Sequence, residues 1–193
     1  MEEKRTVFGL GFVGNGNFNR RNNRQAYDMW SSLIRRANSL RYKEDFNSYS
    51  KVIACEEWHN FQNFAEWFYN NYDFDKYKGF ELDKDILIKG NKVYSPETCC
   101  FVPKEINYLF TKRQNKRGDY PIGVTFKDNK FRATSTQNRK QIFLGYFDTP
   151  QEAFDAYKLS KEQYIKEVAD KWRDLIDPRV YQAMYNYEVE ITD

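Results

Sequence analysis

The sequence has few of the residues that build disulfide frameworks and zinc sites. Its 193 residues include three cysteines and one histidine, and no two cysteines are separated by two residues. Cys55, Cys99 and Cys100 are too few for a framework of several disulfide bridges. Cys55 and His59 lie four residues apart, but structural zinc sites need several closely spaced ligands, so zinc is not expected.

Long apolar runs and a large excess of one charge are also lacking. No stretch approaches the ~18 apolar residues of a membrane span, and no signal-like apolar run opens the chain. We therefore expect a reducing, cytoplasmic setting and no membrane partner. The 31 basic and 28 acidic residues leave a net charge of +3, which is too small by itself to indicate a nucleic-acid partner.

Aromatic residues are abundant instead, at 18% of the chain, and many of them recur at helical spacing. Residues 24–40 are predicted to form a helix with an apolar stripe made of Tyr27, Trp30, Leu33, Ile34 and Ala37. A second helix is predicted over residues 56–72, with a stripe made of Trp58, Phe61, Ala65, Phe68 and Tyr72. Such stripes are typical of a buried core.

The stretch LDKDILIKGNKVYSPETCCFVP, residues 82–103, combines turn residues with short apolar runs. Its last apolar run, residues 99–102, predicts a small buried strand. Asp83 and Asp85 would share one face if they lay on a strand, and such a carboxylate pair can help to bind Mg²⁺. Alternatively, the two carboxylates cap turns or pair with Lys84 or Lys89.

This stretch resembles the core of phage and mobile-element HNH homing endonucleases, and the resemblance extends over about residues 24–110. In that family, two short strands and a helix hold a divalent metal and a histidine base. The resemblance implies that Asp83, Lys84, Asp85 and Asn91 occupy catalytic positions and that Asp83 and Asp85 are metal ligands. Lys84 stands in place of the histidine and Thr98 in place of the closing asparagine. A lysine with an ordinary pKa of ~10.4 is a poor base near neutral pH, which predicts a degenerate centre.

A different pattern begins after a basic, polar segment at residues 111–120, which we predict to be a linker. Three strands in a row are predicted within residues 122–147, separated by polar turns. Thr149 can cap a following helix, and Pro150 suits its first turn. The apolar face expected for that helix consists of Ala153, Tyr157, Tyr164, Val168 and Leu175.

This second region resembles the DNA-binding domain of plant ethylene-response factors, the APETALA-type domain, which phage homing endonucleases also carry. The likeness rests on Gly123-Val124, Lys130-Phe131, residues 144–149, Glu152-Ala153 and Ala156-Tyr157. It implies a three-stranded antiparallel sheet that is packed on a helix and reads the DNA major groove with its free face. The residues expected on that face are Thr125, Lys127, Lys130, Arg132, Thr134, Thr136, Gln141 and Phe143.

The strand pattern, the departures from the plant domains and the local charge also bear on the expectation of DNA binding. Polar residues at alternate positions from Lys130 to Thr136 predict a strand with one polar face. The plant domains carry arginines at the positions of Thr125 and Gln141 and a tryptophan at that of Phe143, so the target sequence is not implied. Between residues 104 and 141 basic residues greatly outnumber acidic ones, which is an electrostatic footprint for nucleic acid.

Together these patterns predict an α+β protein of four segments. These are an HNH-like domain (1–110), a linker (111–120), an ethylene-response-factor-like domain (121–177) and a C-terminal tail (178–193). Three hypotheses for function remain. The first is a double-stranded DNA-binding protein of homing-endonuclease descent with a degenerate centre. The second is a working endonuclease with an altered centre, which uses Asp83, Asp85 or His59 and Mg²⁺ or another divalent metal. The third is a phage protein that binds and inhibits a host or defence protein. All three imply action in the cytoplasm of a bacterial host.

Overall fold

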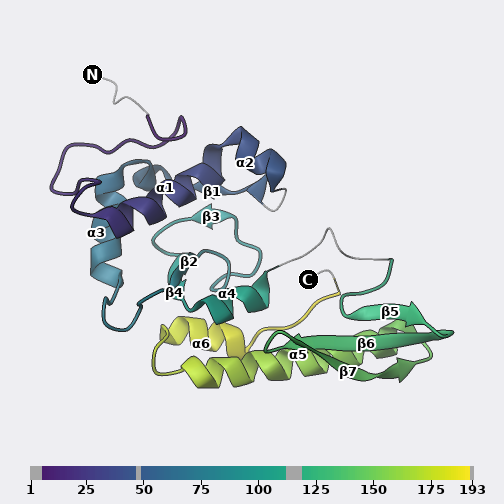
Figure 1. Ribbon diagram of the computed structural model, residues 1–193. Coiled ribbons are helices and arrows are strands. Elements are labelled where there is room, and N and C mark those ends of the chain that lie inside the picture. The colour runs from purple at the N-terminus through teal and green to yellow at the C-terminus, as the bar shows by residue number, and fades with distance from the viewer. Residues whose placement is uncertain (1–5, 47–48, 112–118, 192–193) are drawn as a thin grey trace. The chain divides into compact units, whose positions relative to one another are not determined.

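The computed structural model describes residues 6–46, 49–111 and 119–191, and it contains both helices and strands. The predicted α+β class is confirmed. The chain divides into two compact units, residues 1–104 and residues 105–193. Figure 1 labels their elements. Across the three described ranges, no helix is long and apolar enough to cross a membrane.

The first unit is built from aromatic helices and short strand pairs. Its elements are α1 (Arg24–Asn38), α2 (Leu40–Asp45), β1 (Ile53–Ala54), the 3-10 helix η2 (Glu56–His59), α3 (Phe61–Asn71), β2 (Glu81–Asp83), β3 (Val93–Tyr94) and β4 (Cys100–Val102). β1 pairs with β3 in parallel, and β2 pairs with β4 antiparallel. The predicted buried strand within residues 99–102 is confirmed as β4.

The core of the first unit follows the predicted aromatic stripes. Trp30 on α1 and Trp58, Phe61 and Phe68 further along the chain are almost fully buried. The expected helix 56–72 is divided, because Asn60 accepts a hydrogen bond from the backbone N–H of Gln62 and so starts α3 after η2. The indole N–H of Trp30 donates to the carbonyl of Trp58 at 2.7 Å, which satisfies its polar atom within the core.

The second unit contains α4 (Lys104–Phe110), β5 (Val124–Lys127), β6 (Lys130–Gln137), β7 (Lys140–Phe147), α5 (Pro150–Trp172) and α6 (Pro178–Tyr185). The strands form one antiparallel sheet in the order β5-β6-β7. Figure 1 shows this sheet lying along α5, with α6 beside α5. Thr149 caps α5 in a reciprocal capping box with Glu152, with Pro150 in the first turn, as the sequence predicts.

The segment boundaries differ from the expected ones. Helix α4 falls within the expected first domain, 1–110, but all of it after Lys104 belongs to the second unit. There Glu105 accepts hydrogen bonds from Lys171 at 2.5 Å and Trp172 at 2.7 Å. Most of the expected linker 111–120, residues 112–118, lies outside the described residues. The expected tail 178–193 contains α6, whose Val180 and Met184 are buried.

The apolar face of α5 differs from the prediction at its far end. Ala153, Tyr157, Tyr164 and Val168 are buried as expected. Leu175 lies beyond the end of the helix and is 41% exposed, so its expected place on the helix face is wrong. The chain turns at residues 173–176, and Ile176 is buried in its stead.

Candidate functional site

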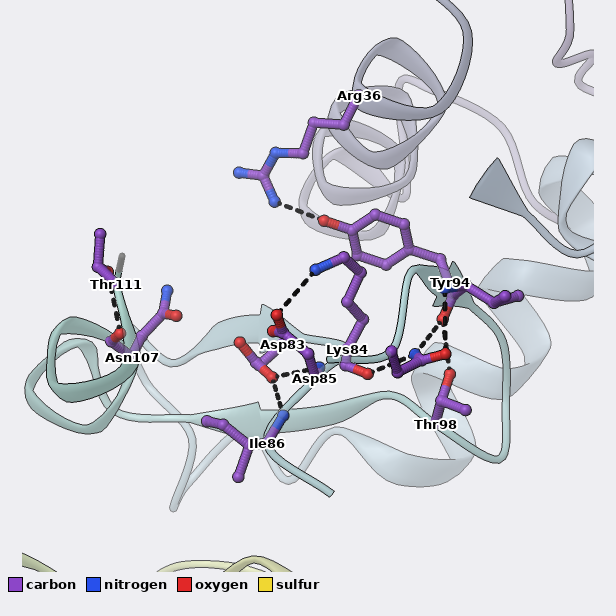
Figure 2. Close-up of polar contacts among 11 residues, drawn as sticks. Arg36, Asp83, Lys84, Asp85, Ile86, Tyr94, Thr98, Asn107 and Thr111 are labelled. Atoms are coloured by element: carbon purple, nitrogen blue, oxygen red, sulfur yellow. Dashed lines mark hydrogen bonds and ion pairs between the residues drawn. The ribbon is translucent and has the colours of Figure 1, made fainter. Parts of the chain in front are cut away.

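Hydrogen bonds between side chains and backbone groups stabilise residues 82–103, the stretch with the HNH-like pattern. Asp83 is the last residue of β2 and is only 7% exposed. Its Oδ1 accepts hydrogen bonds from the backbone N–H groups of Asp85 and Ile86, both at 2.8 Å (Figure 2). Burial, reinforced by the nearby Asp85 carboxylate, raises the pKa of Asp83 to about 6, although these two hydrogen bonds oppose the rise. Asp83 therefore caps a turn.

Asp85 is placed differently from Asp83. The sequence suggested a strand on which both carboxylates would share one face, but β2 ends at Asp83, so that geometry is absent. The half-buried Asp85 instead pairs with the Lys84 ammonium at 3.3 Å. The alternative interpretation of the sequence, a turn cap and a lysine pair, describes these carboxylates.

The remaining positions of the motif also stabilise the loop. The Asn91 side-chain amide donates to the carbonyls of Lys84 at 2.6 Å and Val93 at 2.8 Å. The Thr98 hydroxyl, which stands in place of the closing asparagine, donates to the same Val93 carbonyl at 2.8 Å. Asn91 and Thr98 thus fix the path of the loop between β2 and β4.

The carboxylates near β2 that could act as metal ligands already have protein partners. Within the described ranges, no three His, Cys, Asp or Glu side chains gather as a metal site would require. A divalent cation at Asp83 or Asp85 would have to displace a turn cap or a lysine pair. Burial raises the pKa of the Cys99 thiol to about 12, so a thiolate ligand is disfavoured there. Metal binding at this place would therefore require these contacts to rearrange.

The β5-β6-β7 sheet has a polar face that is free of helix packing. Thr125 on β5 pairs with Arg132 on β6, which pairs with Tyr146 on β7. Directly paired residues point to the same face of a sheet. This register, with the alternation along each strand, gives an outer face made of Thr125, Lys127, Lys130, Arg132, Thr134, Thr136, Gln141, Phe143 and Tyr146. All the residues predicted for the free face therefore lie together on it.

Tyr146 is the residue of this face that the sequence analysis missed. Ala133 pairs with Gly145 but Thr134 pairs with Phe143, so Leu144 is an extra residue in β7. Such a bulge lets Phe143 and Tyr146, three residues apart, lie on the same face with ring centroids 5.2 Å apart. Gly145, a glycine inside a strand, is the sequence signal that could have indicated the bulge.

The opposite face of the sheet is covered by α5. Ala133 and Ser135 of β6 are buried, as are Phe154 and Tyr157 of α5. Gly123 precedes β5 at a φ of +79°, and a Cβ atom there would lie 2.1 Å from the ring of Tyr157. Because the helix and the glycine fit closely, the sheet has one fixed inner face and one open outer face.

The outer face carries both cations and aromatic rings. The Arg132 guanidinium lies over the Phe143 ring, 5.6 Å from its centroid, which is a favourable cation–π geometry. Lys130 is paired with Asp148, whereas Lys127 extends into solvent at the β5–β6 turn. Phe143 is 52% exposed and Tyr146 48% exposed. This mixture can contact both phosphates and bases.

No protein family, curated protein or solved structure matches this chain. The likenesses to HNH endonucleases and to ethylene-response factors therefore rest on the residues quoted above. Function has to be argued from the chemistry of the two regions.

Proposed function

We propose that this chain is a sequence-selective, duplex DNA-binding protein that uses the outer face of the β5-β6-β7 sheet. The observation that carries the proposal is the register, which gathers Lys127, Lys130, Arg132 and the exposed aromatic rings on the face opposite α5. The exposed rings of Phe143 and Tyr146 lie next to each other among polar side chains, and an apolar patch with a polar rim is typical of an interaction site.

The dimensions of the sheet suit the major groove. Neighbouring strands lie about 4.8 Å apart, so the outer strands of a three-stranded sheet are separated by about 10 Å. The major groove of B-DNA is about 12 Å wide and accepts strands as well as helices. The central strand β6 and one neighbour can therefore enter the groove while the other strand follows its edge.

The side chains of the outer face offer distinct contacts to DNA. Arginine binds the major-groove edge of guanine with two hydrogen bonds, and glutamine does the same with adenine. Arg132 and Gln141 are the candidates for these roles, and Phe143 is the candidate for apolar contact with a thymine methyl group. Lys127 and Lys130 would bind phosphates, for which Lys130 would exchange its Asp148 partner.

We also propose that the HNH-like stretch descends from a homing endonuclease of a phage or mobile element and no longer hydrolyses DNA. Lys84 pairs with Asp85 and stands where a neutral base is needed. Asp83 and Asn91 hold backbone groups of the loop. Support comes from these contacts, which engage Asp83, Lys84 and Asn91 with protein groups.

Binding is tested by titrating labelled duplexes, including a randomised pool, at several salt concentrations. The variant Lys127→Ala/Lys130→Ala/Arg132→Ala should bind at least about thirtyfold more weakly, because three charged contacts are lost. The salt slope should fall by ~0.9 for each phosphate contact removed. The control Arg41→Ala/Lys51→Ala/Lys92→Ala removes the same charge from exposed positions of the first unit. Equal losses in both variants would show that the outer face has no special role.

Hydrolysis is tested by incubating supercoiled plasmid with the protein and Mg²⁺ or Mn²⁺. We expect no nicking, and Lys84→His should not restore it, because Thr98 also departs from the HNH pattern. Nicking by the wild-type chain that disappears in Asp83→Ala or Asp85→Ala would replace this part of the proposal with an active endonuclease.

A further inference from the structure

Arg36 and Tyr94 meet in the first unit although they are far apart in the sequence. Arg36 lies in the last turn of α1, and its Nη1 donates to the Tyr94 hydroxyl of β3 at 3.1 Å. Figure 2 shows the guanidinium extending from the helix to this hydroxyl. The Arg36 Cζ atom also lies 5.5 Å from the centroid of the Tyr49 ring.

The hydrogen-bonding capacity of Arg36 exceeds what the surrounding protein uses. Its Nε is buried and has no hydrogen-bond partner in the part of the chain that the structure describes. A guanidinium carries five N–H donors in one plane. A buried charged group without an acceptor is costly, which makes a bound anion the natural complement of Arg36.

A second cation approaches the same tyrosine. The Lys84 ammonium lies 5.6 Å from the centroid of the Tyr94 ring, and Lys84 is only 8% exposed. Asp85 is its ion-pair partner at 3.3 Å, but an ammonium has three donors. The nearby Asp83 carboxylate is directed at backbone N–H groups. Two cations therefore adjoin Tyr94, and one of them, Lys84, is paired with Asp85.

We propose that Arg36, Lys84 and the Tyr94 hydroxyl form an anion site that binds a phosphate group of a nucleic-acid backbone without a metal ion. The planar fork of arginine matches two oxygens of a phosphate. Lys84 and the Tyr94 hydroxyl add further donors, so the three side chains together can meet several oxygens of a phosphate. Burial raises the pKa of Tyr94, so its hydroxyl keeps the proton that it would donate.

The site is independent of the proposed role of the sheet, because every residue in it belongs to the first unit. It gives that unit a function in binding that needs no hydrolysis. A phosphate held there would add one salt-dependent contact to any nucleic acid that the chain binds.

The test follows arginine Nε–Hε NMR signals and the melting temperature of the full chain. Sodium phosphate and sodium dimethyl phosphate are added separately, against sodium chloride at equal ionic strength. Both ligands should shift the Arg36 signal and raise the melting temperature. Arg36→Lys, which lacks this signal, should reduce the rise in melting temperature at least tenfold. The control Arg35→Lys alters the adjacent exposed arginine, which lies over the Tyr42 ring, and should respond like the wild type.

A second pair of variants keeps the result interpretable if Arg36→Lys does not fold. Lys84→Gln should weaken the response at least fivefold, whereas Lys92→Gln, at an exposed position, should leave it unchanged. Absence of any response in the wild type, or equal responses in Lys84→Gln and Lys92→Gln, would overturn the site. A response to inorganic phosphate but not to the diester would overturn its assignment to a nucleic-acid backbone. The triple variant of the sheet should respond normally, which separates this site from the proposed function.

Discussion

The β2–β4 pair and the β5-β6-β7 sheet both carry charged residues at positions that the sequence predicts to be functional. The two regions differ in whether these side chains are buried or exposed. At β2, Asp83 and Lys84 are buried and bonded within their own unit. On the sheet, the inner residues Val124, Ala133 and Ser135 are buried on the side of α5, and the polar residues face outward. A motif position inside a small, tightly connected loop is under structural constraint, whereas an outward position on a packed sheet is free to evolve for contact with a partner.

The largest expected effect concerns the inner face of the sheet. Gly123→Ala should lower the free energy of unfolding of the second unit by about 3 kcal/mol, because the added Cβ would overlap the Tyr157 ring. The control Gly79→Ala has nearly the same φ, +80°, but open space around its Cβ, and should cost only about 1 kcal/mol. Hydrogen exchange of the sheet and helix amides measures the loss. Equal costs at both glycines would mean that backbone strain alone matters and the inner face is loose.

The next effect concerns the buried carboxylate of the strand pair. Asp83→Ala leaves the N–H groups of Asp85 and Ile86 without their acceptor and should destabilise the first unit by about 2 kcal/mol. Asp83→Asn keeps an oxygen for both donors. We therefore expect Asp83→Asn to fold at neutral pH at least as stably as the wild type, as measured by chemical denaturation. A loss as large as that of alanine would show that the charge itself is needed.

The buried Asp83 carboxylate should also make the stability of the chain depend on pH. The pKa of Asp83 in the folded chain is about 6, above its ordinary value of 3.8. Between these values the folded chain holds a proton that the unfolded chain releases, so the contribution of Asp83 to stability is greatest below pH 4 and falls as the pH rises to about 6. The total fall is about 3 kcal/mol. It should be absent in Asp83→Asn, which titration of the unfolding midpoint would reveal.

A smaller effect is expected at the start of α5. Thr149→Ala removes the hydroxyl that accepts from the Glu152 N–H and should destabilise the second unit by about 1 kcal/mol. Thr125→Ala, which alters an exposed residue of the outer face, should change stability far less. Thermal unfolding of the two variants makes the comparison. If Thr125→Ala were the more damaging, the outer face would have an unrecognised structural role.

The sequence predicted the second region more closely than the first. Strands and a capped helix follow from local signals, such as the alternation along β6 and the Thr149-Pro150 start of α5. Every residue of the polar face except Tyr146 was predicted. Tyr146 was missed because it reaches this face through the bulge at Leu144, which depends on how β7 pairs with β6. Local patterns do not encode the register of a distant strand.

In the first region, the elements were predictable but the use of the polar residues was not. The aromatic stripe and the buried strand β4 follow from apolar spacing. Whether Asp83 would face a metal or a backbone N–H depends on where β2 ends, and a three-residue strand has no periodicity that fixes its end. The meeting of Arg36 with Tyr94 joins α1 to β3 and has no local sequence signal.

Substitutions on the outer face of the sheet should change stability least but weaken DNA binding clearly. Phe143→Ser/Tyr146→Ser removes two exposed rings and should alter the free energy of unfolding by only about 0.5 kcal/mol. Duplex binding should nevertheless weaken about tenfold, since apolar contacts with bases are lost. The slope of affinity against salt concentration should stay unchanged, because no charge is removed.

A loss of affinity with an unchanged salt slope distinguishes contacts with bases from contacts with phosphates on the outer face. Removing Lys127, Lys130 and Arg132 should flatten the salt dependence, whereas removing the two rings should lower affinity at every salt concentration by the same factor. Ile142→Ser, which alters an exposed apolar residue on the opposite face of β7, serves as the matched control and should leave binding intact. A flattened salt slope in the ring variant would mean that the rings act only by positioning Arg132, whose guanidinium lies over Phe143.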